Sequence, residues 1–307
     1  MTPTTTSTAV APRAQATAPT GPAVPVRRKR STAWLAVVPL LALVAVGFGA
    51  PALAMATGAF TAKDPATGAS SLSTANLTTS LQGPYLNALL GSVKLSAVSA
   101  GIAAVLGLLL AQAMVAFGSR TLREAVLTGS GVLANFGGVP LAFAFVATLG
   151  NSGVLTNHLG LENTGWNLYS FWGLTLTYLY FLIPLMVLTI TPALEGLRAQ
   201  WREAAQNNGA TKAQYWRHVA LPVLAPSLLG GFVLLFGSAF AAYATAAAMV
   251  GSSIPLVTLQ IADALSGNVL VGQENVALAL SLDMVAVAAV VMAIHIPLQR
   301  RSARWLD

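Results

Sequence analysis

The residues with the most informative types and spacing lie between Glu195 and Pro222, EGLRAQWREAAQNNGATKAQYWRHVALP. This stretch is a long polar interval between two strongly apolar segments. Thr191-Pro192 just before it has the form of an N-cap followed by proline at the first helical position. Apolar residues then recur at helical spacing: Leu194, Leu197, Trp201, Ala204 and Ala205. The pattern predicts a first short amphipathic helix.

A turn and a second helix follow. Gly209 suits the left-handed conformation that closes a helix. Thr211 and Gln214 have the S/T-x-x-E/Q spacing of a capping box, which predicts a second helix from about Lys212. Pro222 is expected to end that helix, because the residue before a proline is pushed away from helical geometry. The stretch therefore predicts two short helices that meet at a glycine turn.

The same stretch resembles a known family signature. Glu203-Ala204-Ala205, Gly209, Val219 and Leu221-Pro222 match the EAA-x3-G-x9-I-x-LP loop of the permease subunits of binding-protein-dependent ABC importers, with valine in place of isoleucine. One alternative is an ordinary amphipathic loop between membrane helices. Another is a DNA-binding helix-turn-helix, which the flanking apolar segments disfavour because they leave no room for a three-helix domain.

Composition places the chain in a bilayer. The hydrophobic fraction is 55%, charged residues are only 8% and the mean hydropathy is +0.70. Soluble domains carry about 25% charged residues. With the family resemblance, this indicates an all-α integral membrane protein with about six transmembrane helices, the fold of a type I ABC importer permease with a cytoplasmic coupling-helix loop.

The chain offers little for catalysis or for a resident cofactor. It has no cysteine and three histidines, so a thiolate metal site is excluded and a metal centre is not expected. Gly137-Gly138 is not followed by Gly-Lys-Ser/Thr, so it is not a Walker A phosphate loop. We therefore expect no enzyme activity and no bound cofactor, and the resemblance implies that ATP and Mg belong to a separate subunit.

The apolar segments divide the chain into predicted parts. A basic cluster, Arg27 to Arg30, directly precedes the first span and is typical of a cytoplasmic anchor. The alanine-rich end of that span also resembles a signal-peptidase site, so cleavage is an alternative to an uncleaved anchor. The predicted parts are a disordered cytoplasmic tail 1–30, a first transmembrane helix 31–57, an extracytoplasmic loop 58–85, a five-helix core 86–299 including the coupling loop 192–222, and a basic cytoplasmic tail 300–307.

Charge gives an independent test of this topology. With six spans and a cytoplasmic N-terminus, all of the 16 Lys and Arg residues except Lys63 and Lys94 fall on the cytoplasmic side. The inverted arrangement would violate the positive-inside rule. The same topology places both termini and the stretch 195–222 in the cytoplasm, in a cell or inner membrane.

Two segments within the spans are candidates for a transport path. Asn135-Phe136-Gly137-Gly138-Val139-Pro140 interrupts the third predicted span, and backbone that leaves helical pairing in a membrane must be satisfied by protein or water. A simple proline kink is the alternative. The fifth predicted span carries small residues and hydroxyls from Gly237 to Thr245. The predicted path residues are Asn135, Gly138, Ser238 and Tyr243.

One further pattern concerns helix packing. Ala103, Gly107 and Ala111 fall four residues apart in the second span, forming a small-residue face that would let another helix approach closely. Chance in an alanine-rich chain is the alternative.

The resemblance implies a set of partners. Two permease subunits, homologous or identical, surround a central path in the lipid bilayer, and an extracytoplasmic solute-binding protein docks on the outer loops. The second loop helix fits a groove on a cytoplasmic ATP-binding subunit dimer. The expected coupling residues are Glu203, Ala204, Ala205, Gly209, Tyr215, Trp216, Arg217, Val219, Leu221 and Pro222, with Tyr215, Trp216 and Val219 as apolar anchors. No nucleic acid partner is expected.

Around the path the sequence is similar to the polyamine (spermidine/putrescine), iron(III) and phosphonate branch of these permeases, so a small solute of that kind is the expected substrate. The competing hypothesis is an ion-gradient-driven secondary transporter or channel. Such proteins usually carry intramembrane carboxylates or repeated architecture. In this sequence Asp283 is a weak candidate for such a carboxylate.

Overall fold

The structure is a computed structural model that describes residues 37–63, 70–266 and 274–303. The predicted tail 1–30 and residues 304–307 of the predicted tail 300–307 lie outside these residues, whereas 300–303 belong to the last helix, Glu274–Ala303. Six segments in the described part are long and apolar enough to cross a membrane, as expected: Val38–Ala59, Gly83–Phe117, Val139–His158, Phe171–Glu195, Lys212–Phe240 and Glu274–Gln299. The chain divides into two units, residues 1–50 and 51–307.

In the first unit the described chain is helical. Helix α1 covers Val38–Val44, with Pro39 in its first turn, where the missing N–H is tolerated. A π-helical turn, Ala45–Gly49, carries the chain into α2, Ala50–Ala59. The apolar segment therefore stays helical to Ala59, beyond the predicted end of the first span.

The predicted loop 58–85 contains regular structure that its small polar residues did not indicate. Strands β1, Thr61–Lys63, and β2, Ser70–Leu72, pair antiparallel with Thr61 opposite Leu72, and α3 covers Ala75–Ser80. Long-range amide contacts hold this region. Asn76 and Asn275 both donate from Nδ2 to the Thr61 carbonyl oxygen, at 2.9 and 2.7 Å.

Helices α4, Gly83–Phe117, and α8, Phe171–Glu195, make the most extensive contact in the second unit. In α8 61% of the most apolar window is buried, against 28% in α4, so α8 is the central helix. The predicted small-residue face of α4 is confirmed as a packing surface. Ala103, Gly107 and Ala111 are all buried, and a Cβ at Gly107 would lie 2.5 Å from Met186 Cβ of α8.

We expect Gly107→Leu to separate α4 from α8, because the Met186 side chain and the Ile183 carbonyl leave no space for a side chain. Overpacking of this kind costs about 1–3 kcal/mol. Gly101→Leu is the matched control, since nothing lies within 4 Å of a Cβ at that position of the same helix. Thermal unfolding in detergent should show a lower midpoint for the Gly107 variant than for the control. Equal midpoints would mean that the close approach does not contribute to stability.

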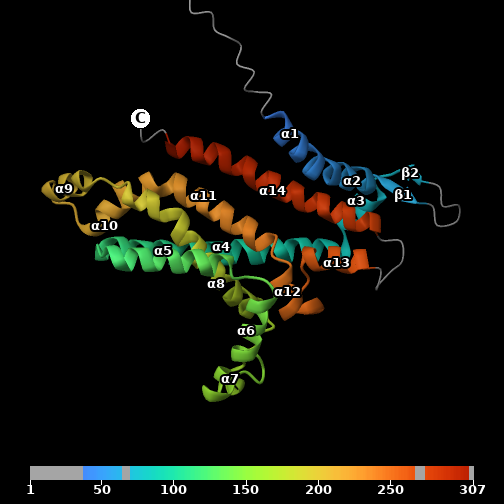
Figure 1. The fold of residues 1–307 in the computed structure, drawn as a ribbon, viewed down its shortest axis with the longest axis horizontal. Coiled ribbons are helices and arrows are strands. Elements are labelled where there is room, and N and C mark those ends of the chain that lie inside the picture. Colours follow the sequence, from blue (N-terminus) through green and yellow to red (C-terminus); the bar gives the residue numbers. More distant parts are fainter. Residues whose placement is uncertain (1–36, 64–69, 267–273, 304–307) are drawn as a thin grey trace, which may run out of the picture. The chain divides into compact units, whose positions relative to one another are not determined.

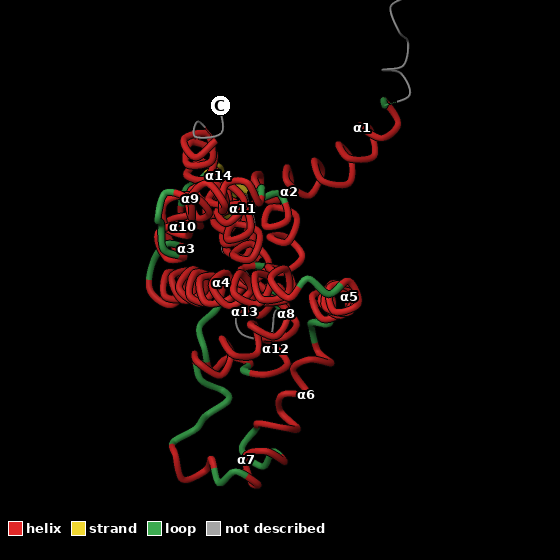
Figure 2. The backbone as a smooth tube through the Cα atoms, turned by 90° about the vertical axis from the view of Figure 1, so that its left-hand side faces the viewer, coloured by secondary structure: helices red, strands yellow, loops and turns green. Residues whose placement is uncertain are grey.

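Two of the predicted spans are broken helices. The third, expected at 125–149, consists of α5, Arg120–Asn135, and α6, Val139–Leu149. The fifth, expected at 223–250, consists of α11, Leu221–Phe240, and α12, Ala244–Met249. Figures 1 and 2 show α5 running beside α4 and α8, while α6 leads away from them at the break.

The remaining elements connect or flank these helices. Helix α7, Val154–His158, and a 3-10 turn, Leu161–Thr164, fill the predicted loop between α6 and α8. A 3-10 turn, Gly251–Ser253, and α13, Val257–Ser266, precede α14, Glu274–Ala303, which packs on α11 and α3 (Figure 1). The core is formed mainly by α4, α8 and α11, with buried Leu174, Leu182, Met186, Ile190 and Leu235.

Two predicted helix boundaries were wrong. Thr191 and Pro192 do not open a new helix but lie inside α8, where the Thr191 hydroxyl donates to the Val187 carbonyl oxygen at 2.6 Å. The Thr191 hydroxyl therefore bonds to the carbonyl four residues earlier in its own helix, instead of capping the start of a new helix as the sequence Thr191-Pro192 suggested.

Pro222 does not end the second loop helix either. A π-helical turn, Trp216–Ala220, joins α10 to α11, and the Leu221 N–H bonds to the Trp216 carbonyl five residues earlier. Pro222 then falls in the first turn of α11, where a missing N–H is tolerated. The second loop helix and the fifth span are therefore one continuous helical segment.

Candidate functional site

The first candidate site is the hairpin formed by α9, Ala199–Asn207, and α10, Lys212–Tyr215, at one end of the second unit (Figure 1). Gly209 has φ 76°, as its role in the turn predicted. The Gly209 N–H bonds to Gln206 O and the Ala210 N–H to Ala205 O, each at 2.9 Å, which is a complete Schellman motif.

The second helix of the hairpin begins with the predicted capping box. The Thr211 hydroxyl accepts from the Gln214 N–H at 3.3 Å, and the Gln214 side chain accepts from the Thr211 N–H at 2.8 Å. Both sides of the glycine turn therefore have satisfied backbone groups, so the angle between the two helices is defined by local bonds.

The predicted coupling residues occupy different surroundings in this hairpin. Glu203 and Ala204 are exposed on α9, and Ala205 is partly buried. Tyr215 and Trp216 are partly buried and line a cavity that also contacts Leu194, at the end of α8. Val219 and Pro222 are also partly buried, whereas Arg217 and Leu221 are exposed.

The structure shows an exposed stripe on the second helix of the hairpin, which adds Ala213 to two of the predicted coupling residues. Ala213, Arg217 and Leu221 follow one another at four-residue spacing along the second helix, and all three are exposed. Side chains four apart share one face of a helix. The four-residue spacing of the stripe is visible in the sequence, whereas the predicted apolar anchors Tyr215 and Trp216 are partly buried on the inward face.

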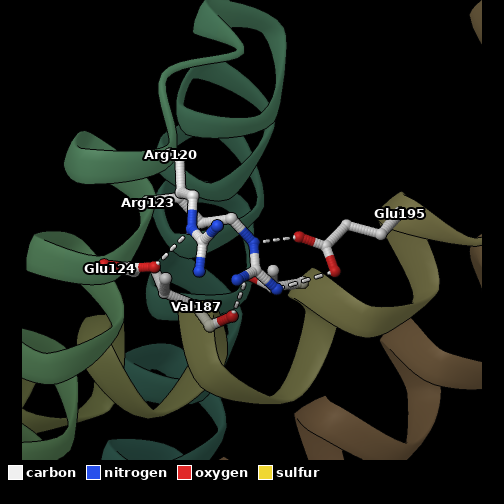
Figure 3. Close-up of polar contacts among 6 residues, drawn as sticks. Arg120, Arg123, Glu124, Val187 and Glu195 are labelled. Carbon is white, nitrogen blue, oxygen red and sulfur yellow. Dashed lines mark hydrogen bonds and ion pairs between the residues drawn. The ribbon is translucent and has the colours of Figure 1, made fainter.

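An ion pair ties the start of α5 to the end of α8 near the hairpin (Figure 3). Arg123 donates from Nε and Nη2 to the two carboxylate oxygens of Glu195, the second bond measuring 3.0 Å. The carboxylate raises the pKa of Arg123 above its usual value, through this hydrogen bond and its charge. Arg120 pairs with Glu124 at 2.9 Å. The first turn of α5 therefore lies at the same end of the helices as the hairpin.

The second candidate site is where the two helix breaks meet. Gly138 has φ 77° and ψ −152°, a conformation open essentially to glycine, and its N–H donates to the Thr245 hydroxyl oxygen at 2.9 Å. In the second break the Ala242 carbonyl accepts from the Tyr178 hydroxyl at 2.9 Å. Side chains of α12 and α8 thus satisfy backbone groups that the helices release, as a membrane interior requires.

A cavity of about 310 Å³ lies beside these breaks. It contains three of the four predicted path residues, Asn135, Gly138 and Ser238. The other lining residues are Ala134, Gly137, Phe181, Leu185, Ala242 and Thr245. Every one of these side chains is neutral. We call this cavity the break cavity.

Tyr243, the fourth predicted path residue, does not line the break cavity. It is exposed and lines a separate cavity of about 300 Å³ with Asp263 of α13. Thr245, which the sequence reasoning did not select, is buried and bridges the breaks instead. Tyr243 and Thr245 lie on either side of Ala244, the first residue of α12. Which of the two side chains faces the break cavity therefore depends on the residue at which that helix begins.

Asp283, the weak candidate for an intramembrane carboxylate, lies within α14. It is only 8% exposed in α14, and its Oδ2 has no hydrogen-bond partner. It does not line the break cavity. The buried carboxylate is therefore separate from the polar groups at the helix breaks.

We expect Thr245→Val to weaken the junction of the two breaks, because valine keeps the shape but leaves the Gly138 N–H without its partner. A buried unsatisfied group of this kind costs about 1–3 kcal/mol. Thr245→Ser, which keeps a hydroxyl, is the control. The detergent unfolding midpoint should fall for valine and recover with serine, and a fall of similar size in both variants would contradict the bridging role.

Comparison with known proteins agrees with this architecture. Residues 103–304 match the family described as "Binding-protein-dependent transport system inner membrane component". The chain is similar to a bacterial ABC transporter that imports the acidic polysaccharide alginate, with TM-score 0.64, 18% identity and coverage of 89% of this chain and 95% of that one. A second structure of a bacterial alginate ABC transporter, in complex with an alginate pentasaccharide-bound periplasmic protein, gives TM-score 0.67 at 18% identity, covering 88% and 94% of the two chains.

Sequence relatives match over shorter regions. The sulfate transport system permease protein CysT of Salmonella typhimurium is 41% identical over 68 residues, which cover 22% of this chain and 24% of that protein. The spermidine/putrescine transport system permease protein PotC of Escherichia coli is 29% identical over 91 residues, 30% and 34% of the two chains. Because the family match covers well over half of the residues and the fold agrees, the chain belongs to the family of binding-protein-dependent transport system inner membrane components.

Proposed function

We propose that this multi-pass membrane protein is the permease subunit of an ATP-driven importer, and that its hairpin couples solute movement to a cytoplasmic ATPase dimer. The observation that carries this proposal is the hairpin itself. It presents Glu203 and Ala204 on one exposed helix and the stripe Ala213, Arg217 and Leu221 on the next. The two helices join through the closed turn at Gly209.

The second loop helix is continuous with α11, which suits a mechanical role. Lys212 to Phe240 form one helical segment, and α11 ends at the break that borders the cavity through Ser238 and Ala242. A force applied at the hairpin would therefore reach the break cavity along one continuous helical segment. Glu203 and Ala204 could contact the same partner or the loop's own basic residues, and ATP with Mg would bind to the partner.

The break cavity supports a solute path of neutral polar character. The printed names of two relatives refer to sulfate and to spermidine/putrescine, which carry opposite charges. A lining of neutral side chains and backbone groups does not select for either sign of charge. We therefore propose passage of a small polar solute, with polyamine, iron(III) and phosphonate as the candidates from the resemblance, chosen by a separate extracytoplasmic binding protein.

Co-expression tests this proposal. The chain should co-purify in detergent with a Walker-A ATPase and with a second permease copy or homologue, and uptake should require ATP and the binding protein. Ionophores that dissipate a sodium or proton gradient should leave ATP-driven uptake in proteoliposomes unchanged. Autonomous, gradient-driven uptake by the chain alone would instead establish the secondary transporter and overturn the proposal.

A further inference from the structure

A cavity of about 590 Å³ lies beneath the hairpin. We call it the hairpin cavity. Its walls come from the end of α4, the end of α8, and both helices of the hairpin. Three of the lining residues are cationic, Arg198, Arg202 and Lys212.

These cations line the cavity without a matching acid; all three are exposed, and the Arg198 guanidinium also lies over the Trp201 ring, 5.7 Å from its centroid. Arg198 and Arg202 are four residues apart at the start of α9, and Lys212 opens α10 across the turn. No aspartate or glutamate lines the cavity. The ion pairs found among the described residues use Arg120 and Arg123 instead. Three cations facing one cavity repel one another, and an anion between them would remove that repulsion.

The opposite wall of the hairpin cavity is apolar. Val115 and Ala116 of α4, Leu194 and Leu197 near the end of α8, and Trp216 line it. Gln112, Gln206 and Thr211 add neutral polar groups between the apolar wall and the cations. The cavity is therefore amphipathic, with an apolar side and a cationic side.

The cavity lies at the ends of candidate membrane spans. α4 ends at Phe117 and α8 at Glu195, while the next candidate span begins at Lys212. The cavity thus lies where three candidate spans end, and the hydrocarbon of a bilayer gives way to headgroups near the ends of its spanning helices. Basic pockets between membrane helices at this level are suited to anionic lipid headgroups.

We propose that the hairpin cavity binds a phosphate group, held by Arg198, Arg202 and Lys212, and that the apolar wall makes an anionic phospholipid its preferred source. Arginine guanidinium groups match phosphate oxygens with paired N–H donors, and lysine adds a point charge. The bound group would join α9 to α10 and hold the hairpin against the end of α8. This binding does not depend on the proposed coupling to an ATPase.

Native mass spectrometry of the full chain in detergent tests the inference with two lipids of equal chain length, phosphatidylglycerol and zwitterionic phosphatidylcholine. We expect phosphatidylglycerol to be retained more strongly. Arg202→Gln should weaken its binding roughly five-fold, from about 1 kcal/mol per cation near a membrane surface, and Arg202→Lys should restore most of it. Arg120→Gln is the matched control, since it removes an exposed cation on α5 that does not line the cavity.

A second arm identifies the source of the phosphate. Inorganic phosphate that displaces phosphatidylglycerol, when chloride at equal ionic strength does not, would support the site and show that free phosphate also fits it. If neither phosphate nor chloride displaces phosphatidylglycerol, and Arg202→Gln still weakens its binding, the result would support the lipid as the ligand. Two outcomes would overturn the inference. One is equal binding of the two lipids with no competition by inorganic phosphate. The other is an equal loss of phosphatidylglycerol binding in the Arg202→Gln and Arg120→Gln proteins. Co-purification with an ATPase is measured separately, so this failure would leave the proposed function standing.

Discussion

Replacing Gly209 with valine is expected to uncouple solute uptake from ATP hydrolysis while the protein remains inserted in the membrane. The residue has φ 76°, and nothing lies within 4 Å of a Cβ added there. The cost therefore comes from the backbone alone, at roughly 1–2 kcal/mol for an L-residue in the left-handed region. The turn would change its geometry to relieve this strain, and the Schellman bonds that fix α9 against α10 would be lost.

The experiment compares uptake and binding-protein-stimulated ATPase activity in proteoliposomes that contain the complete transporter. Gly209→Asn is the matched control, because asparagine tolerates the left-handed region better than other non-glycine residues. We expect uptake per ATP to fall in the valine protein and to be largely kept in the asparagine protein. Normal stimulated ATPase activity and normal uptake in the valine protein would count against a lever role for the hairpin.

Ser238→Trp is expected to block transport by filling the break cavity. The cavity is only about 310 Å³, and Ser238 lies on α11 just before the break at Ala241. A tryptophan side chain there would press on Phe181 or on the Gly137-Gly138 backbone, which also line the cavity. Overpacking costs about 1–3 kcal/mol, and if this cost falls on the solute-conducting state, uptake should drop by roughly 5- to 150-fold.

Leu234→Trp is the matched control for this prediction. Leu234 lies one turn earlier on α11, is 47% exposed and does not line the cavity. Radiolabelled-solute uptake should fall only in the Ser238 protein, and both proteins should still co-purify with the ATPase. If the two variants transport at the same rate, the break cavity is not on the solute path.

Much of the local structure followed from the sequence, because short-range rules control it. The turn at Gly209 needed a residue that tolerates positive φ, and the Thr211–Gln214 capping box needed side chains three residues apart. Both formed as predicted. The small-residue face on α4 also followed, since the four-residue spacing through Gly107 forms a face whatever its neighbour is. The six apolar segments follow from length and composition.

Tertiary structure decided where helices continue and which residues meet. Pro192 and Pro222 suggest helix boundaries, but α8 continues past Pro192 to Glu195, and a π-helical turn leads into α11, whose first turn tolerates the missing N–H of Pro222. The helix break at Gly137-Gly138 was visible in the sequence. Its partner Thr245, 107 residues away, was not, since a hydrogen bond between two breaks depends on packing rather than on spacing.

The same distinction separates the two faces of the hairpin. Composition alone identified a polar loop with aromatic and basic residues, and the motif identified its register. Only the packed structure turned Tyr215 and Trp216 inward, toward the ends of α4 and α8, and left Ala213, Arg217 and Leu221 outside. The physical reason is that burial of the large aromatic surfaces against neighbouring helices stabilises the hairpin, and that contact depends on side chains distant in the chain.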